Sequence, residues 1–267
     1  MTSEEGSETR RFIVTKVGIQ ISSVRKYLQT PEDVLASFRK VSEIGYRIIQ
    51  IQWISPDVPM EFIHDALKET KLTCVGTQDY YDVVVSQWDE VIAMNDLWGS
   101  TNICVSGIPE PYQSYEGCLA FTKELNKRAA SLQEKGKILS FHPRHMDVLH
   151  FNGKKSLELI LENTPEQFQF VLDVYHLVKA GLDPVEWIHK AAGRNDLIHF
   201  KDSKINPDGS EGLAPIGQGS IAWEEIFQAC SDTQINYGLA EQESWQKDPF
   251  DCLKESYDFI VAHGIDA

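Results

Sequence analysis

The sequence predicts a single (β/α)8 barrel, and three observations lead to this fold class. Short runs rich in β-branched residues alternate with longer amphipathic segments eight times along the chain. Several of the short runs are almost continuously apolar, as expected of parallel strands that are covered on both faces. The length of 267 residues also suits one barrel of this kind. We therefore expect one domain over residues 1–267, in which the polar residues 1–11 form a flexible tail.

The expected strands and helices alternate in regular order. The apolar, β-branched runs predict strands at 17–21, 46–53, 72–78, 101–106, 137–142, 167–173, 196–201 and 236–242. The amphipathic segments that follow them predict helices at 31–43, 59–70, 89–98, 115–134, 155–162, 184–192, 222–231 and 249–262. Two of these helices have a capping residue followed by proline at their start, Thr30 with Pro31 and Asp183 with Pro184.

A doubly wound open sheet is the alternative arrangement of such alternating units. The dinucleotide-binding motif typical of that fold is missing, because Gly217-Gln218-Gly219 lacks a third glycine and precedes a late helix. The longest irregular stretch, 203–219, contains two prolines and four glycines and follows the seventh expected strand. Because long loops at the mouth of a barrel often carry function, we expect this one to border the site.

The charge balance and the cysteines limit the classes of protein. Asp and Glu number 40 against 25 Lys and Arg, so the formal net charge is −15. Such an acidic surface repels phosphate backbones and anionic lipids, which argues against nucleic acid and membranes as partners. The five cysteines are scattered and form no CxxC pair, which favours buried thiols over disulfides or a thiolate zinc site. With no apolar signal peptide in the sequence, we expect a cytoplasmic protein.

Metal-binding side chains gather at the ends of the last four expected strands. In a parallel barrel, the carboxyl ends of all strands meet at one mouth. Carboxylate and imidazole together suit a divalent metal, with Mn²⁺ as our first choice and Co²⁺, Mg²⁺, Zn²⁺ and Fe²⁺ as alternatives. The side chains at these strand ends are His142, His145, Asp173, His176, His199, Lys201, Glu241 and Glu243.

Each of these residues also has an ordinary structural interpretation. A histidine at a strand end is often a hydrogen-bonded structural residue. Asp173 alone is a candidate helix cap, and Glu241 alone is a candidate solvated carboxylate of a loop. Because four neighbouring strand ends carry the same chemistry, we favour a metal site over four separate structural roles.

An ordered set of motifs resembles the xylose-isomerase-like sugar phosphate isomerase/epimerase superfamily. The resemblance extends from about residue 17 to the C-terminus, and the motifs are specific as a set. They are Gly18-Ile19-Gln20-Ile21-Ser22-Ser23-Val24-Arg25, Ile44-Gly45-Tyr46, Leu172-Asp173-Val174-Tyr175-His176, Ala180-Gly181-Leu182-Asp183-Pro184, Ile198-His199-Phe200-Lys201-Asp202, Gly217-Gln218-Gly219 with Trp223, and Glu241-Gln242-Glu243.

The resemblance implies a Mn²⁺-like ion that Asp173, His199 and Glu241 bind as the family's aspartate, histidine and glutamate ligands. Epimerases of this kind usually have a glutamate at the end of strand five, where this chain has His142. With a histidine at this place, the chain is similar to the subgroup that contains inosose dehydratases and lyases. His142 is then either the fourth ligand or a catalytic base. We expect His145 and Glu241 to share the acid and base roles.

The resemblance also implies substrate-binding residues. His176 matches a histidine that contacts substrate beside the metal in related epimerases. Lys201 lies two residues past His199 and shares its face of the strand, where it can neutralise an oxyanion or a phosphate. We add Glu243 and Trp53 to the residues expected to bind a small carbohydrate.

Aromatic residues near the mouth have two interpretations. Their faces stack on the C–H face of sugar rings, and packing beneath loops is the alternative. The residues concerned are Trp53, Tyr80, Tyr81, Tyr175 and Trp245. The tryptophans at 98, 187 and 223 lie in or beside expected helices, so we expect them to be structural. Residues 110–112 form either a wall of the pocket or a turn.

These observations predict a divalent-metal-dependent isomerase or epimerase that acts on a sugar or sugar-like polyol through a metal-stabilised enediolate. The alternative is a dehydratase or lyase that acts on an oxidised sugar, glycoside or inositol, since both reactions begin with removal of a proton next to a carbonyl. A repair endonuclease shares the barrel but requires a cationic surface, against which the charge of −15 argues. A non-catalytic barrel would lack the ligand-type residues, and a homo-oligomer is compatible with the sequence.

Overall fold

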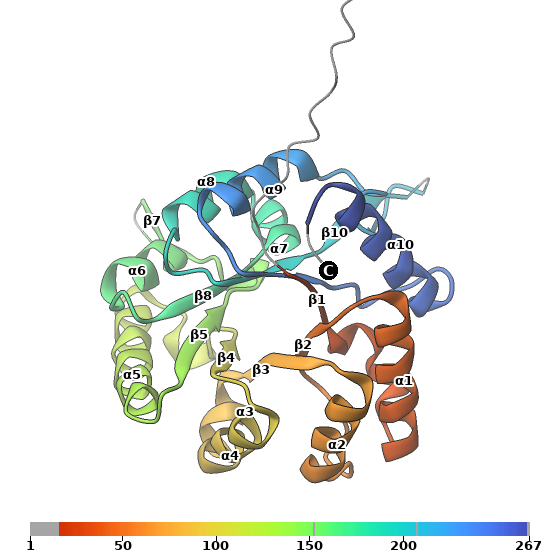
Figure 1. Ribbon diagram of the computed structural model, residues 1–267. Helices are drawn as coiled ribbons and strands as arrows, with labels where there is room; N and C mark the ends of the chain where they lie inside the picture. Colours follow the sequence, from red (N-terminus) through yellow and green to blue (C-terminus); the bar gives the residue numbers. More distant parts are fainter. Residues whose placement is uncertain (1–15, 152, 207, 266–267) are drawn as a thin grey trace, which may run out of the picture.

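Eight parallel strands close into a barrel in the computed structural model, which describes residues 16–151, 153–206 and 208–265. Each strand overlaps one of the eight expected strands, and their order around the barrel is β1, β2, β3, β4, β5, β8, β9 and β12, with β12 pairing back to β1 (Figure 1). The (β/α)8 fold class is therefore confirmed, and the open sheet is excluded. The strands are β1 Lys16–Gln20, β2 Ile48–Ile51, β3 Thr73–Tyr80, β4 Asn102–Ser106, β5 Ile138–His142, β8 Gln169–Asp173, β9 Leu197–Phe200 and β12 Tyr237–Ala240.

A ring of helices surrounds the barrel, and each of the eight expected helices is present (Figure 1). The predicted capping residues act as expected. Thr30 Oγ1 accepts a hydrogen bond from Asp33 N at 3.2 Å, and Asp183 Oδ1 accepts one from Val185 N at 2.8 Å. The helices are α1 Pro31–Ile44, α2 Met60–Thr70, α4 Trp88–Trp98, α5 Tyr115–Gln133, α6 Ser156–Asn163, α8 Pro184–Lys190, α9 Trp223–Asp232 and α10 Pro249–Ala262.

Short additional elements connect the strands at the mouth. The prediction that 203–219 is irregular is wrong in part, because this stretch contains most of an antiparallel hairpin formed by β10 and β11. Hydrogen bonds within a tight turn, including Asn206 N to Ser210 O at 2.8 Å, close that hairpin. The other additions are η1 Ile21–Tyr27, α3 Tyr81–Ser86, η2 Glu110–Tyr112, η3 His145–Asp147, β6 His150–Phe151, β7 Lys154–Lys155, α7 Val174–Lys179, β10 Asp202–Ile205 and β11 Glu211–Ala214.

Asp202 fixes the end of this hairpin loop against α9. Its Oδ2 atom accepts hydrogen bonds from Gly217 N and Gly219 N, both at 3.0 Å, and from Trp223 Nε1 at 2.8 Å. A Cβ atom at Gly219 would collide with the Asp202 carboxylate, so only glycine allows this approach. The Gly217-Gln218-Gly219 motif therefore anchors a loop and binds no dinucleotide phosphate in this arrangement.

The core lies between the strands and the helices and contains most of the apolar side chains. Trp98, Trp187 and Trp223 are buried, as expected of structural residues. All five cysteines are buried and free of disulfides, as the sequence predicts.

Tyr112 of η2 packs on Tyr81, so 110–112 is a packed turn. Among the described helices, none has the length and apolarity needed to cross a membrane, and the expected tail at 1–11 lies outside the described residues.

Candidate metal centre

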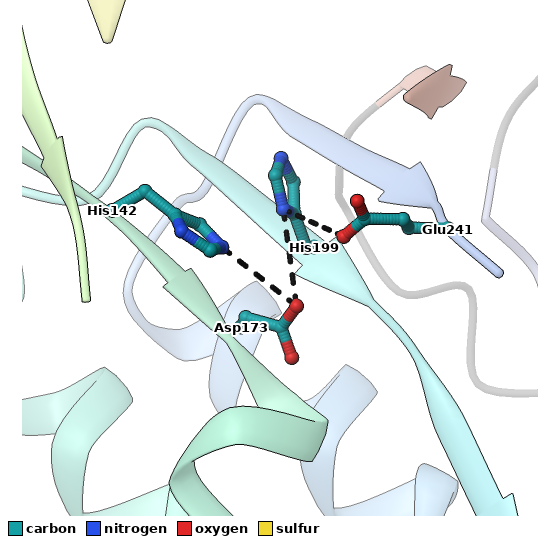
Figure 2. Close-up of side chains that lie close together, drawn as sticks. All are labelled: His142, Asp173, His199 and Glu241. Carbon is teal, nitrogen blue, oxygen red and sulfur yellow. Dashed lines mark ion pairs between the residues drawn. The ribbon is translucent and has the colours of Figure 1, made fainter. Parts of the chain in front are cut away.

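Four strand ends bring His142, Asp173, His199 and Glu241 together in a buried cluster. One ligand-type atom from each residue lies within 4.8 Å of the other three (Figure 2). His199 Nδ1 lies 3.1 Å from Glu241 Oε2 and 3.9 Å from Asp173 Oδ2, and His142 Nε2 lies 3.8 Å from the same Asp173 oxygen. The sequence places these residues up to 99 positions apart, and closure of the barrel brings them to one point.

The tautomer of His199 is set by a glutamine of β2. Gln50 Oε1 lies 2.7 Å from His199 Nε2 and also accepts a hydrogen bond from Gln20 Nε2 at 2.8 Å. Because Gln50 Oε1 is an acceptor, His199 Nε2 carries the hydrogen and Nδ1 presents a lone pair to the cluster. This is the arrangement that a metal-binding histidine needs.

His142 is oriented in a similar way by a serine at the end of β4. Ser106 Oγ donates to the carbonyl oxygen of His142 at 3.4 Å and lies 3.1 Å from His142 Nδ1. Since the single hydroxyl hydrogen is used, Ser106 Oγ accepts from Nδ1–H, and His142 Nε2 keeps a lone pair. Burial lowers the pKa of His142, so this imidazole is neutral near pH 7.

The two carboxylates also divide their oxygens between a structural partner and the cluster. Asp173 Oδ1 caps α7 by accepting a hydrogen bond from His176 N at 2.9 Å, so the helix-cap interpretation of this residue is correct for one oxygen only. Glu241 Oε1 accepts from Ser22 Oγ at 3.3 Å. Asp173 Oδ2 and Glu241 Oε2 remain directed at the cluster.

The four converging atoms fit a divalent cation. His142 Nε2 and His199 Nδ1 are buried and form no hydrogen bond with any residue that the structure describes, whereas Asp173 Oδ2 and Glu241 Oε2 are ion-paired with Lys201. Buried lone pairs without a hydrogen bond are costly, and a cation that accepts them removes that cost. Two imidazole nitrogens and two carboxylate oxygens form a donor set suited to Mn²⁺, Fe²⁺, Co²⁺ or Zn²⁺.

Lys201 and Glu243 add charge beside the cluster. Lys201 Nζ is buried and lies 3.3 Å from Asp173 Oδ2, 3.0 Å from Glu241 Oε2 and 3.0 Å from Glu243 Oε2. Burial opposes the charge of Lys201, but the three carboxylates hold its pKa well above the ordinary value. Burial likewise opposes ionisation of Asp173 and Glu241. Lys201 and the neighbouring histidines together outweigh burial, so the pKa values of both carboxyl groups lie well below normal.

The charges of this group do not balance. With all three carboxylates ionised and both imidazoles neutral, Lys201 compensates one negative charge and two remain. Burial and the neighbouring Glu241 carboxylate raise the pKa of Glu243, as expected where negative charge is in excess. A bound divalent cation would bring the group to neutrality.

A pair of histidines lies next to the cluster. His145 Nδ1 lies 3.1 Å from His176 Nδ1, and the rings of His142 and His176 are 5.6 Å apart. Burial lowers the pKa of His145 and lowers that of His176 to about 3. Both rings are therefore neutral near pH 7, and one of the two Nδ1 atoms donates a hydrogen to the other.

Trp53 lies apart from the cluster, at the end of β2. Its ring is 6.1 Å from that of Tyr80, and the Arg25 guanidinium lies over it at 5.3 Å. Of the other aromatic candidates, Tyr81 is buried in the core, and Trp245 packs on the core while partly buried. Tyr175 lies beside His176, with ring centroids 5.2 Å apart.

Sequence reasoning assigned no role to the residues that orient the ligands, namely Gln20, Gln50, Ser22 and Ser106. One signal was present in the sequence. The runs Gly18-Ile19-Gln20-Ile21 and Ile48-Ile49-Gln50-Ile51 each place an amide inside a buried apolar strand. A buried polar side chain in such a run requires a hydrogen-bond partner across the barrel, and here that partner is a ligand or its neighbour.

A comparison with family models identifies the class of protein that this fold and cluster define. The model described as xylose isomerase-like TIM barrel matches residues 38–261, and the chain belongs to this family. The resemblance noted in the sequence is therefore confirmed. Curated proteins gave no match.

Solved structures with the same fold include three from bacteria. A sugar phosphate isomerase/epimerase from Parabacteroides distasonis has a TM-score of 0.78 and 18% identity, with 98% of this chain and 96% of that chain covered. The probable 3-DHS dehydratase involved in petrobactin synthesis from Bacillus anthracis has a TM-score of 0.70 and 14% identity, with 92% and 99% covered. The 3-keto-D-glucoside 4-epimerase from E. coli has a TM-score of 0.67 and 15% identity, with 93% and 99% covered. At these identities the likeness concerns the fold.

Proposed function

We propose that this protein is a divalent-metal-dependent isomerase or epimerase of a sugar or sugar-like polyol. The observation that supports it most is the convergence of four buried ligand-type atoms, from two histidines and two carboxylates, at the mouth of the barrel. In this proposal His142, Asp173, His199 and Glu241 hold the ion, and Mn²⁺ is the first choice. His142 acts as a ligand, because Ser106 occupies its Nδ1 and its Nε2 faces the cluster.

When bound, the metal acts as a Lewis acid that lowers the energy of an enediolate. The residues of the chain supply proton transfer. In the His145–His176 pair, the ring that donates through Nδ1 has a bare Nε2 that accepts a proton, and the other ring has an Nε2–H that can give one. Glu241 provides a carboxylate from a different strand. Two separate groups of this kind suit removal of a proton on one side of a carbon and its return on another.

Lys201 and Glu243 bind substrate in this proposal. The Lys201 ammonium lies beside both carboxylate ligands and can stabilise negative charge on a substrate oxygen. Glu243 is less buried than Glu241 and shares Lys201, so its second oxygen is available to a sugar hydroxyl. His176 would contact the same substrate beside the cluster, since its ring lies 5.6 Å from that of His142.

Dehydration or lyase chemistry on a keto sugar or glycoside is the second candidate. The observation that favours it is His142 at the position where epimerases of this kind have a glutamate. One structural neighbour bears the name of a dehydratase and another that of a keto-glucoside epimerase, so the fold accommodates both reactions. Product analysis with keto sugars and oxidised inositols separates them, because elimination gives an unsaturated or diketo product that absorbs in the ultraviolet.

The proposed function is tested by metal removal. Dialysis against a chelator should abolish turnover, and Mn²⁺ or a related ion should restore it. Asp173→Asn should weaken metal binding by at least about 100-fold, because it removes a charged ligand. It should preserve the fold, because the amide oxygen still caps α7. Asp183→Asn is the matched control, since Asp183 caps α8 and is exposed. Full activity without any metal would refute the proposal.

A further inference from the structure

A cavity of about 760 Å³ lies between the ends of β2 and β3 and the helices α2, α3 and α4. These helices cover the outer side of β2 and β3 (Figure 1). The lining changes in character along the cavity. Gln52, Trp53 and Gln78 lie at the strand ends. The helices contribute mostly apolar side chains, among them Met60, Met94 and Trp98, together with the exposed Glu61 and Glu90. The cavity therefore joins hydrogen-bonding groups at the strand ends to a largely apolar wall on the helix side.

The polar end of this cavity adjoins the candidate metal centre through β2. Gln50 hydrogen bonds to the ligand His199 at 2.7 Å, and Gln52 follows two residues later. Gln52 itself lies one residue past the end of β2. None of the four cluster residues lines the cavity, so a substrate anchored at the candidate metal centre would reach the Gln52 end by extending past Gln50.

Gln78 offers an unused hydrogen-bond acceptor at this end. Its Nε2 atom donates to Gln52 Oε1 at 3.4 Å, which orients the amide. Gln78 Oε1 is buried and has no hydrogen-bond partner among the residues that the structure describes. An acceptor in this state suits a hydroxyl group of a bound sugar.

Trp53 is held at this end in a strained conformation. Its φ angle is +56°, in the left-handed region that an aromatic residue rarely adopts. Such strain is concentrated at binding and catalytic sites, where the surrounding structure maintains it. Contacts with Tyr80 and Arg25 hold the indole beside the cavity.

We propose that this cavity binds the apolar aglycone of a glycoside whose sugar ring lies at the metal centre. A free monosaccharide has an apolar C–H face but carries hydroxyl groups on nearly every carbon, and these would lose hydrogen bonds between Met60, Met94 and Trp98. Thioether and indole side chains pack well against flat aromatic groups. The inference rests on the proposed function for the position of the sugar, and it specifies the substrate as an aryl or similar apolar glycoside.

Isothermal titration calorimetry of the full chain with two probes tests the inference. Phenyl β-D-glucopyranoside should bind at least tenfold more tightly than methyl β-D-glucopyranoside. Met94→Trp, which fills the space along the apolar wall from α4, should abolish this preference. Met60→Trp fills the same space from α2 and serves if the first variant fails to fold. Ala93→Trp is the matched control, because Ala93 is exposed on the same helix, and it should retain the preference.

Metal binding is measured separately, so that the two proposals can fail separately. Asp173→Asn should lose metal and keep the preference for the phenyl glucoside, which would support the cavity site. Equal affinity for both glucosides in a wild-type protein that binds Mn²⁺ and converts keto sugars would overturn the inference and leave the proposed function standing. A preference that persists unchanged in both filling variants would also overturn it, because the phenyl group would then bind elsewhere.

Discussion

Gln50 determines which nitrogen of His199 faces the candidate metal centre. Its oxygen accepts from both Gln20 and His199, so the lone pair of His199 points inward before any ion binds. The side chains of His142, Asp173 and Glu241 are held in a similar way. In each of them one polar atom contacts a protein partner and the other faces the cluster. The four side chains are therefore preorganised, which would reduce the entropy lost if they bind the proposed metal ion.

Replacement of Gln50 tests this preorganisation. Gln50→Leu should weaken Mn²⁺ binding by about 10- to 100-fold, because His199 loses the acceptor that fixes its tautomer. Gln50→Glu keeps an acceptor at the same place. It should therefore bind Mn²⁺ about 10- to 100-fold more tightly than Gln50→Leu does. Calorimetric titration of both variants measures the difference. Equal affinities in Leu and Glu variants would show that the contact has no role in metal binding.

Lys201 stabilises the metal-free protein, and its removal should separate stability from metal binding. Lys201→Met leaves Asp173, Glu241 and Glu243 without a cation, so the metal-free variant should lose roughly 3–5 kcal/mol of unfolding free energy. Mn²⁺ should bind at least as tightly as before, because a repelling charge is gone. Urea unfolding with and without Mn²⁺ measures both effects, and Lys204→Met on the neighbouring hairpin is the control. A parallel loss of metal affinity would contradict this account.

At the scale of elements, the hairpin loop after β9 is anchored by a buried carboxylate. Asp202 directly follows Lys201 and collects three hydrogen bonds from the loop and from α9. The loop therefore holds the backbone that positions Lys201. Its order depends on the absence of a side chain at Gly219.

Gly219→Ala should consequently cost more than an ordinary glycine replacement. The new Cβ would collide with Asp202, so we expect a loss of about 2–3 kcal/mol as one or more buried hydrogen bonds break. Gly136→Ala is the control. Gly136 has a φ of +68°, but an added Cβ would meet no atom within 4 Å, so the loss should be only the left-handed backbone strain of about 1 kcal/mol. Chemical denaturation measures the unfolding free energies of both variants. Equal losses would argue against the Asp202 anchor.

Hydrophobic periodicity predicted the long elements well and the short ones poorly. All eight barrel strands and their main helices followed from apolar runs and caps such as Thr30 and Asp183. The helix α7 was missed because it begins directly after Asp173 and is too short to display a period. The β10–β11 hairpin was missed because four-residue strands rich in Asp, Ser, Glu and Gly carry no apolar alternation.

At the scale of the whole molecule, the sequence could predict which residues meet but not how they are held. The ends of consecutive barrel strands converge in any fold of this class, so Asp173, His199 and Glu241 could be placed at one mouth. The contact of Gln50 with His199 crosses the barrel between strands 149 residues apart, and no local pattern reports it. The left-handed backbone of Trp53 was also hidden, because it is a property of the closed barrel.

The pH dependence of stability should report the buried histidines. The pKa of His176 is lowered to about 3 and that of His142 is also lowered, both by burial. The unfolded chain binds these protons near pH 6.5, so the unfolded state carries more protons below that pH. Stability of the metal-free protein is therefore retained above about pH 6.5 and lost as the pH falls, by up to about 1.4 kcal/mol per pH unit for each histidine.

Two variants test this dependence between about pH 6.5 and pH 5, above the range in which carboxylates titrate in the unfolded chain. In His176→Gln, the free energy of unfolding should decline less steeply with falling pH, by up to about 1.4 kcal/mol per pH unit. His189→Gln, at an exposed position of α8, should leave it unchanged. Urea unfolding in the presence of a chelator gives the free energies. An unchanged slope in His176→Gln would show that this ring is protonated in the folded protein.

Anomalous diffraction from crystals grown with Mn²⁺ would locate the proposed ion itself. We expect one strong peak within coordination distance of His142 Nε2, Asp173 Oδ2, His199 Nδ1 and Glu241 Oε2. The peak should be absent from Asp173→Asn crystals grown in the same solution. A peak elsewhere, or none at a Mn²⁺ concentration that saturates related metal sites, would contradict the assignment of this cluster as a metal centre.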